Sequence, residues 1–348
     1  MSWDNVSSVK NINLWTGYSD TTQGHLFVNG KHQLQLKAGV TFNLKSGTTE
    51  GPTQDEVAQA LSLINNQDGG PLKYLTLTTE NIYTRIYDPN YMQVEHVTSP
   101  EDDIYDYIFE WYVNSTPENN HGFWSEGVAL KLAYTDSTGK SVVVNTSTYG
   151  SGTKAYVTVC CYQPVLYGKY GENRIALNMK YLSVTSDNYK NLNSGNYTHE
   201  SAAYRQYWLY IDDGYFTVFN FDGAQDPKEN VSVKDDLRPY STYKEEDSVM
   251  WDWIYCTYFP NVKCGAITYD VPIKVMSSFN NSIYDVNITV NQLENQITFL
   301  AATTDVEHLD TAKNEKTPFD IHLYDQFGNS ASVHINSSGN QVTIESVS

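Results

Sequence analysis

The sequence is poor in basic residues, and arginine is especially scarce. Lysine and arginine together number 22 against 41 acidic residues, which gives the 348-residue chain a formal charge of −19 at pH 7, and only four of the 22 are arginines. Proteins that bind nucleic acid or an anionic membrane surface neutralise phosphate groups with clustered lysine and arginine. We therefore expect neither nucleic acid nor an anionic membrane surface among the partners of this protein.

The sequence also lacks the long apolar runs that mark membrane-spanning and exported segments. No stretch approaches the roughly 18 apolar residues that a transmembrane helix needs. The first residues, MSWDNVSSVK, show neither the charged region nor the apolar region of a signal peptide. These features predict no transmembrane segment. Three alternatives for the location remain. The protein is cytoplasmic, for example in an inclusion, it is released by a route without a cleaved signal, or the sequence is that of a mature fragment.

Motifs of metal, cofactor and nucleophile chemistry are missing as well. The chain has no glycine-rich phosphate loop and no G-x-S-x-G turn, and its eight histidines include no helical pair with zinc-binding spacing. Acidic pairs such as Asp212–Asp213 fit turns and solvated loops, although two distant carboxylates could still form a glycosidase site. We therefore predict no metal, no cofactor and a protein that is not an enzyme, with a glycoside-active enzyme as an alternative.

Cysteine is rare and its spacing is uninformative about metals. Cys160 and Cys161 are adjacent, whereas Cys256 and Cys264 flank a short turn. Neither pair has the two-residue spacing of a zinc knuckle. Free buried thiols and a Cys256–Cys264 disulfide both remain open, with a metal site as a third alternative.

Tyrosine, in contrast, is abundant and unevenly distributed. The chain has 28 tyrosines, and 17 of them lie between Tyr149 and Tyr269. Tyrosine joins a large apolar ring to a polar hydroxyl, which suits contact surfaces, but it is also a common strand residue. The distribution therefore predicts a strand-rich centre that contributes either a core or an interface.

The clearest secondary-structure signals lie in the first hundred residues. Apolar side chains occupy every second position of 34–44, which predicts a half-buried strand preceded by a hairpin turn at Asn29–Gly30. A capping box at Thr53 and Glu56, with an apolar stripe after it, predicts one amphipathic helix over 54–64.

The rest of the chain reads as strands separated by turns. The stretch QYWLYIDDGYFTVFNF (206–221) predicts a hairpin around Asp213–Gly214 that is apolar on both faces. The whole pattern predicts a mainly β protein of two or three antiparallel sandwich-like modules with one short helix near the N-terminus. We predict an N-terminal module at 1–98, a Tyr/Trp-rich central domain at 107–270 and an immunoglobulin-like module at 271–348.

The stretch MWDWIYCTYFPNVKCG (250–265) concentrates aromatic residues along one predicted strand. Strand alternation places Trp251, Trp253 and Tyr255 on the same face, and 206–221 adds Trp208 and Tyr210 as a similar aromatic set. Such a face can be core, a protein interface, a carbohydrate platform or a membrane-inserting hairpin. We take these five residues as the predicted binding residues.

Two segments carry a resemblance to known proteins. LFVNGKHQLQLKAGVTFNL with TQDEVAQALSLINN resembles β-modular bacterial exported, phage-tail-like or insect-active proteins, and DQFGNSASVHI resembles bacterial immunoglobulin-like modules. The resemblance implies a class and assigns no residue a role. We expect a non-enzymatic binding or self-assembling protein, structural, inclusion-forming or toxin-associated, whose partner is a second copy, another protein or a glycan. A carbohydrate-binding module of a fibre tip or toxin is the alternative.

Overall fold

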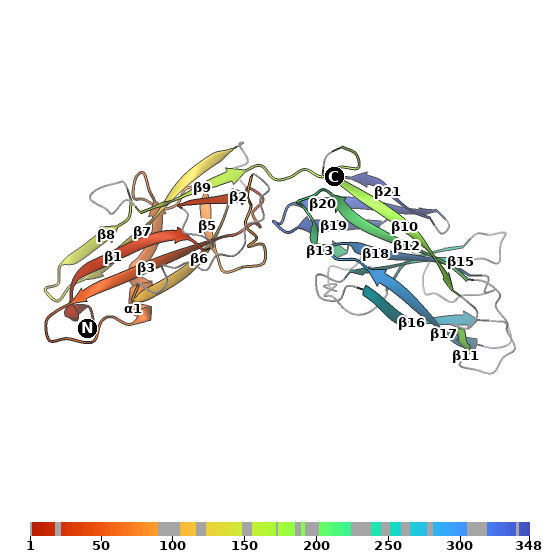
Figure 1. Ribbon diagram of the computed structural model, residues 1–348, viewed down its shortest axis with the longest axis horizontal. Helices are drawn as coiled ribbons and strands as arrows, with labels where there is room; N and C mark the ends of the chain where they lie inside the picture. Colours follow the sequence, from red (N-terminus) through yellow and green to blue (C-terminus); the bar gives the residue numbers. More distant parts are fainter. Residues whose placement is uncertain are drawn as a thin grey trace. The chain divides into compact units, whose positions relative to one another are not determined.

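The chain folds into two compact units, and the described elements are strands apart from one α-helix and one short 3-10 helix (Figure 1). The structure is a computed structural model and describes residues 2–17, 22–89, 105–115, 123–147, 155–171, 173–184, 189–191, 202–223, 238–244, 251–258, 265–276, 281–304, 319–338 and 341–348. Unit 1 comprises Met1–Pro164 with Phe327–Asn329, and unit 2 comprises Val165–Gln326 with Ser330–Ser348. The predicted fold class is confirmed: the protein is mainly β, its sheets are antiparallel apart from one strand pair, and its one described α-helix lies near the N-terminus.

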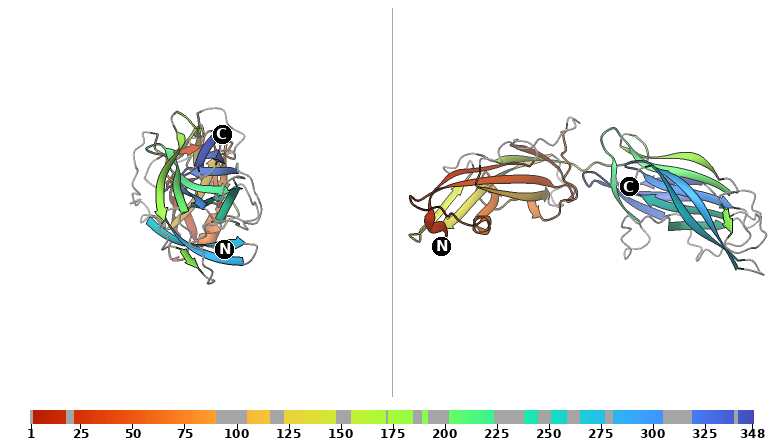
Figure 2. Two further views of the ribbon diagram at one scale, coloured as in Figure 1. Left: turned by 90° about the vertical axis from the view of Figure 1, so that its right-hand side faces the viewer. Right: turned by 60° about the horizontal axis from the view of Figure 1, so that its bottom comes forward.

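Unit 1 consists of two sheets, which Figures 1 and 2 show as two layers. Sheet A has the order β1-β3-β6-β5 and is antiparallel throughout. Sheet B has the order β2-β9-β7-β4, with β8 also paired to β7, and its β2–β9 pair is parallel. A short 3-10 helix, Ser2–Asn5, precedes the strands β1 Val6–Thr16, β2 Gln23–Phe27, β3 Leu34–Leu44, β4 Leu61–Asn65, β5 Leu75–Thr78, β6 Tyr107–Ser115, β7 Trp124–Thr135, β8 Ser141–Asn145 and β9 Val157–Tyr162.

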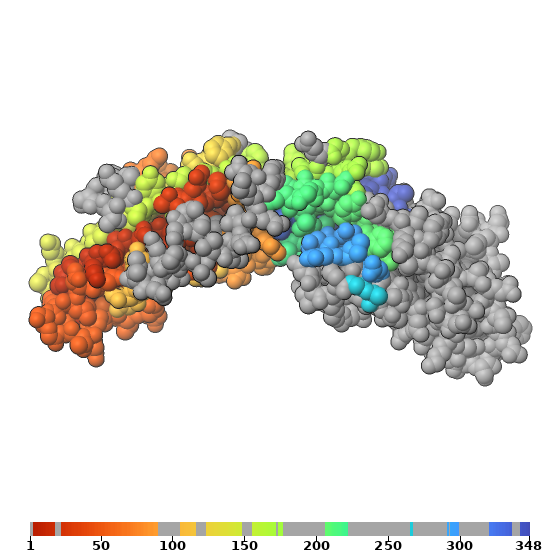
Figure 3. Space-filling view, viewed as in Figure 1, coloured from red at the N-terminus to blue at the C-terminus, as the bar shows by residue number. Residues whose placement is uncertain are grey.

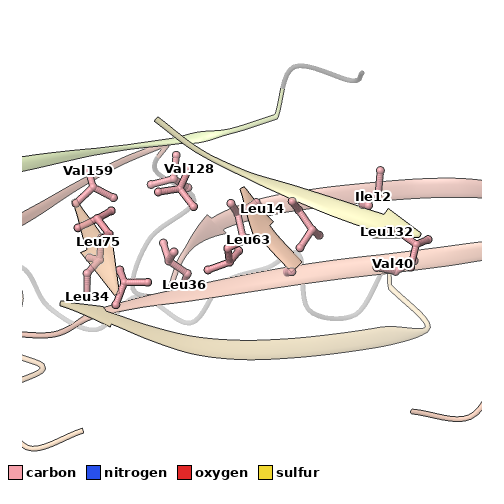
Figure 4. Close-up of a cluster of buried hydrophobic side chains, with 14 of the residues drawn as sticks. Ile12, Leu14, Leu34, Leu36, Val40, Leu63, Leu75, Val128, Leu132 and Val159 are labelled. Carbon is pink, nitrogen blue, oxygen red and sulfur yellow. The ribbon is translucent and has the colours of Figure 1, made fainter. Parts of the chain in front are cut away.

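Alternation along β3 and β7 builds the core between these layers. The even-numbered residues of β3 from Leu34 to Phe42 are buried, as are Val128, Leu130 and Leu132 of β7. Successive side chains of a strand point to opposite faces, so each strand buries one face against the other sheet. Figure 4 shows the resulting cluster of leucine, isoleucine and valine side chains. The alternation predicted for 34–44 is therefore confirmed.

Helix α1, Gln54–Ala60, begins where the capping box predicts but ends earlier than expected. The Thr53 side chain accepts a hydrogen bond from the Glu56 backbone N–H, and the Glu56 carboxylate accepts one from the Thr53 N–H. The predicted continuation to 64 is wrong, because Leu61–Asn65 forms β4 and pairs with β7. Pairing with the buried strand β7 outweighs the helical spacing of these apolar residues.

The turn at Asn29–Gly30 exists but does not form the predicted hairpin. Gly30 adopts a positive φ of 72°, and the Asn29 side chain accepts hydrogen bonds from the backbone N–H groups of Lys31 and His32. Strand β2, however, pairs with β9 in sheet B, whereas β3 pairs with β1 and β6 in sheet A. The turn therefore passes the chain from one layer to the other.

The described strands of unit 2 form three sheets. Sheet C has the order β10-β12-β18-β15-β14, sheet D the order β11-β17-β16, and sheet E the order β13-β19-β20-β21. All their pairs are antiparallel. The strands are β10 Arg174–Val184, β11 Tyr189–Asn191, β12 Ala202–Asp212, β13 Val218–Gly223, β14 Arg238–Lys244, β15 Trp251–Tyr258, β16 Gly265–Met276, β17 Asn281–Gln292, β18 Ile297–Thr304, β19 Phe319–Asp325, β20 Ser330–Ser338 and β21 Gln341–Val347.

The predicted hairpin around Asp213–Gly214 is wrong, because this turn, like the one at Asn29–Gly30, connects strands of two different sheets. Strand β12 belongs to sheet C and β13 to sheet E, so the two do not pair. Gly214 does not take the positive φ that a two-residue type I′ hairpin turn requires. Instead the Asp213 carboxylate accepts hydrogen bonds from the backbone N–H groups of Tyr215 and Phe216, which turns the chain toward the second sheet.

The two compact units do not follow the three predicted segments. Strands β6 to β9, placed in the predicted central domain, complete sheets A and B of unit 1. Strands β19 to β21, placed in a separate terminal module, form sheet E of unit 2 with β13. These pairings join strands that lie far apart in the sequence, so no local sequence signal reveals them.

A core substitution in β3 should therefore destabilise the protein strongly. Leu36 is completely buried, and we expect Leu36→Ala to lower the free energy of unfolding by about 2–5 kcal/mol. Val143 of β8, which is 54% exposed, is the control, and Val143→Ala should change the free energy of unfolding by less than about 0.5 kcal/mol. Urea denaturation of the full chain measures both, and equal effects would contradict the assigned core.

Candidate functional site

The five predicted binding residues lie on one face of sheet C by strand register. Trp208 of β12 pairs with Thr298 of β18, and Thr298 in turn pairs with Thr257 of β15. Residues opposite each other in a sheet share a face, and so do every second residues of a strand. Trp208 and Tyr210 therefore share a face with the odd-numbered positions Trp251, Trp253 and Tyr255.

Part of this face is covered by the chain itself. Trp208 is buried, and its indole N–H donates a hydrogen bond of 2.8 Å to the backbone oxygen of Asn291. Gln206 is fully buried beside it and bonds to both the N–H and the oxygen of Asn291. Figure 3 shows the green residues of β12 beside the blue segment that runs from the end of β17 into β18. Trp208 is thus a residue of the interior, while Tyr210 is half-buried.

The structure describes the other three predicted residues only as strand positions. Trp251, Trp253 and Tyr255 pair with Thr304, Ala302 and Leu300 of β18, the middle strand of the sheet. Their side chains lie outside the described part of the structure, as does Cys264 of the predicted Cys256–Cys264 pair. Cys160 and Cys161 of β9 are buried free thiols, and burial raises the pKa of Cys161.

A second candidate surface, which sequence reasoning missed, begins with a buried carboxylate in β7. Glu126 occupies a core-facing position of the same alternation as Val128 and Leu130, yet it is charged and only 3% exposed. Its Oε1 accepts hydrogen bonds of 2.8 Å from the Asn65 side chain and from the backbone N–H of Lys73, and its Oε2 accepts one of 2.9 Å from the N–H of Tyr74. A buried carboxylate is tolerated when donors surround it in this way.

The segment that Glu126 holds, residues 65–74, is organised by its own hydrogen bonds. The Asn65 N–H bonds to the oxygen of Gly70, and the Asn65 side-chain oxygen accepts from the N–H groups of Gln67 and Asp68. The N–H of Asn66 donates to the oxygen of Gly127 in β7. This loop, which we call the 65–74 loop, is therefore fixed to β7 of sheet B at both of its ends.

The 65–74 loop presents an aromatic residue at the surface. Tyr74 is 41% exposed, and its ring lies 5.1 Å from that of the half-buried Trp124, with an angle of 53° between the planes. Lys73 and Asp68 form an ion pair of 2.8 Å on the same loop, with both side chains about half exposed. The Asp68 carboxylate raises the pKa of Lys73, and Tyr74 and Glu126 add to this effect. A signal existed in the sequence: a glutamate interrupts the apolar alternation of β7.

Three of the described histidines, His25, His32 and His334, have side-chain partners. His32 is buried against Phe27 and Phe327 within unit 1; its Nδ1 accepts from the Phe27 N–H, and its Nε2–H donates to the oxygen of Arg85. His25 bonds to the hydroxyl of Tyr162 at 3.1 Å.

His334 of β20 lies between two carboxylates, 2.5 Å from Asp320 and 3.4 Å from Glu345. The part of the chain that the structure describes contains no group of three or more His, Cys, Asp or Glu side chains able to hold a metal ion. Among the described residues no helix is both long and apolar enough to cross a membrane.

Comparison with known proteins gives little guidance. No protein-family model matches the chain, and no curated protein matches it. Among solved structures, the C-terminal domain of the AgI/II polypeptide BspA of Streptococcus agalactiae aligns with 97% of this chain and 99% of its own length, at 9% identity and a TM-score of 0.18. A TM-score of that size is too low to relate the two folds.

Removing the charge of Glu126 should destabilise unit 1. Glu126→Gln leaves one acceptor oxygen and places an amide NH₂ against backbone donors, so we expect the free energy of unfolding to fall by about 1–3 kcal/mol. The exposed Glu80 of the same unit provides the control, since Glu80→Gln should change it by less than about 0.5 kcal/mol. Thermal and urea denaturation compare the two, and an unaffected Glu126→Gln protein would refute the structural role of the carboxylate.

His32 should make unit 1 less stable in acid. Burial lowers the pKa of His32 to about 4 from its ordinary 6.5. Above pH 6.5 the imidazole is neutral in both states; below it the unfolded chain gains a proton that the folded chain does not. Stability is therefore lost as the pH falls from 6.5 to 4, by about 3 kcal/mol at pH 4.

The variant His32→Leu isolates this contribution. Between pH 7 and pH 4 the free energy of unfolding of this variant should fall by about 3 kcal/mol less than that of the parent protein. This difference does not depend on how stable the variant is at pH 7. Urea denaturation at both pH values measures this double difference. An identical pH dependence in the two proteins would show that His32 is not held neutral by the fold.

Proposed function

We propose that the protein is a non-enzymatic, self-assembling binding protein that associates with further copies through the edge strand β5 of unit 1. Three of the eight large apolar side chains exposed in the described residues, Tyr74, Leu77 and Ile82, fall within the nine residues that contain β5. Scattered apolar residues are ordinary on a surface, but a group around one strand is typical of an interaction site. This grouping is the observation that carries the proposal.

The backbone of β5 supports pairing with a second copy. Strand β5 lies at the end of sheet A, and no other described strand pairs with its outer edge. An edge strand offers N–H and C=O groups to another chain, and two identical edges can pair antiparallel about a twofold axis. Leu77 and its symmetry mate would then add apolar contact to the backbone hydrogen bonds.

The charge of the chain sets the conditions for association. A charge of −19 makes copies repel one another at pH 7, and this repulsion weakens with added salt and as the pH approaches the isoelectric point near 4.7. An inclusion-forming or toxin-associated role is one form of this proposal. Tyrosines add further negative charge above about pH 10, so dense assemblies of this protein should dissolve in alkali.

The experiment follows the molar mass of the full chain by size-exclusion chromatography with light scattering. We expect a dimer or larger species at pH 5 to 6, increasing with salt and dissociating as the pH rises. Leu77→Lys should shift the association constant down by about tenfold or more, because it buries a charge at the paired edge. A protein that stays monomeric from pH 5 to 9 would refute self-assembly.

A matched substitution at another edge tests the choice of strand. Val143 is 54% exposed on β8, an edge of sheet B, so Val143→Lys makes the same chemical change elsewhere in unit 1. It should leave association within about twofold of the parent protein. If Val143→Lys abolishes association and Leu77→Lys does not, β5 is not the contact.

A further inference from the structure

Tyr74, one of the exposed apolar side chains grouped around β5, also makes a ring contact of its own with Trp124. Trp124 packs against the core of unit 1, and Tyr74 lies against Trp124 with ring centroids 5.1 Å apart. The more exposed ring, that of Tyr74, therefore contacts an aromatic residue that packs against the core. Such a contact restricts the conformation of an exposed aromatic side chain, which can then offer its apolar face to a ligand.

Two charged side chains lie on the same loop as this ring. The Lys73 ammonium and the Asp68 carboxylate lie 2.8 Å apart, and both side chains are about half exposed. The ammonium has three N–H donors and the carboxylate has several acceptor sites, so the ion pair leaves hydrogen-bonding capacity on each group. The 65–74 loop thus carries one exposed aromatic ring, one strong donor and one strong acceptor.

The backbone that carries these side chains is ordered before any ligand arrives. Both Lys73 and Tyr74 donate their backbone N–H groups to the buried carboxylate of Glu126. Asn65 closes the other end of the loop through its backbone and its side chain. Binding to a preorganised site avoids the entropic cost of ordering a loop, which helps a small ligand most.

We propose that Tyr74, Trp124, Lys73 and Asp68, which we call the Tyr74 platform, bind a neutral pyranose sugar. The C–H face of a pyranose ring is apolar and flat enough to stack on Tyr74, while its hydroxyl groups, which both donate and accept, suit the Lys73 ammonium and the Asp68 carboxylate. Sugars that carry carboxylate, sulfate or phosphate groups are repelled by a chain of charge −19. The inference does not depend on self-assembly.

The test titrates the full chain with three neutral probes, cellotetraose, laminaritetraose and lactose, by isothermal calorimetry. At least one probe should bind saturably, with a dissociation constant on the order of 1 mM, as expected for contact on one side of a sugar. Tyr74→Ala should weaken that binding by about tenfold, whereas Tyr74→Phe should stay within about threefold because the stacking ring remains. Lys73→Gln with Asp68→Asn should weaken binding even though the ring is intact.

Substitution of Tyr74 should leave the fold intact, since the loop is held through the backbone N–H of Tyr74 and not through its ring. Thermal unfolding checks this for each variant. Tyr170, which is 79% exposed in unit 2, is the matched control, and Tyr170→Ala should bind as the parent protein does.

Three results would overturn the inference. The first is that none of the probes binds saturably up to about 10 mM. The second is equal loss of binding in Tyr74→Ala and Tyr170→Ala, which would place the site elsewhere. The third is loss of binding in the Leu77→Lys protein when it is monomeric, which would make the site a property of the assembly and not of one chain.

Discussion

A buried negative charge has to be surrounded by hydrogen-bond donors, and in unit 1 this constraint organises the surface. Glu126 lies on the core-facing side of β7, where the neighbouring positions are apolar. Its two oxygens receive three N–H groups from residues 65, 73 and 74, which are distant in sequence. Because leaving the carboxylate unsatisfied would cost several kcal/mol, the 65–74 loop has little freedom to move away. The backbone at Tyr74 and the start of β5 are held in place as a consequence.

The aromatic residues of this protein have two different roles. Trp208 fills the interior of unit 2 and satisfies its indole N–H with the backbone of Asn291. Tyr74 has a supported but exposed ring, and the residues around β5 add apolar side chains beside it. Aromatic rings therefore contribute both to the core and to the exposed surface. The position of a ring in the fold determines which of the two it joins.

Local features of the fold could be predicted from the sequence, and pairing could not. Alternation over 34–44 predicts β3, and the Thr53–Glu56 capping box predicts the first turn of α1, because both signals lie within a few residues. The turns at Asn29 and Asp213 are correctly placed, but each passes the chain to another sheet, which depends on partners more than 100 residues away. Residues 61–65 fit a helix or a strand by spacing alone, and only the pairing with β7 decides between them.

The Tyr74 platform could not be predicted from the sequence either, because it also depends on contacts between residues far apart in the chain. The one sequence signal for it is a glutamate among the core-facing positions of β7. Glu126 holds the 65–74 loop through the backbone N–H groups of Lys73 and Tyr74, and amide hydrogen exchange of these two residues measures this directly. We predict that both amides exchange slowly in the parent protein and much faster in Glu126→Gln, with the β3 amides less affected. Rapid exchange of these two amides in the parent protein would show that Glu126 does not hold the loop.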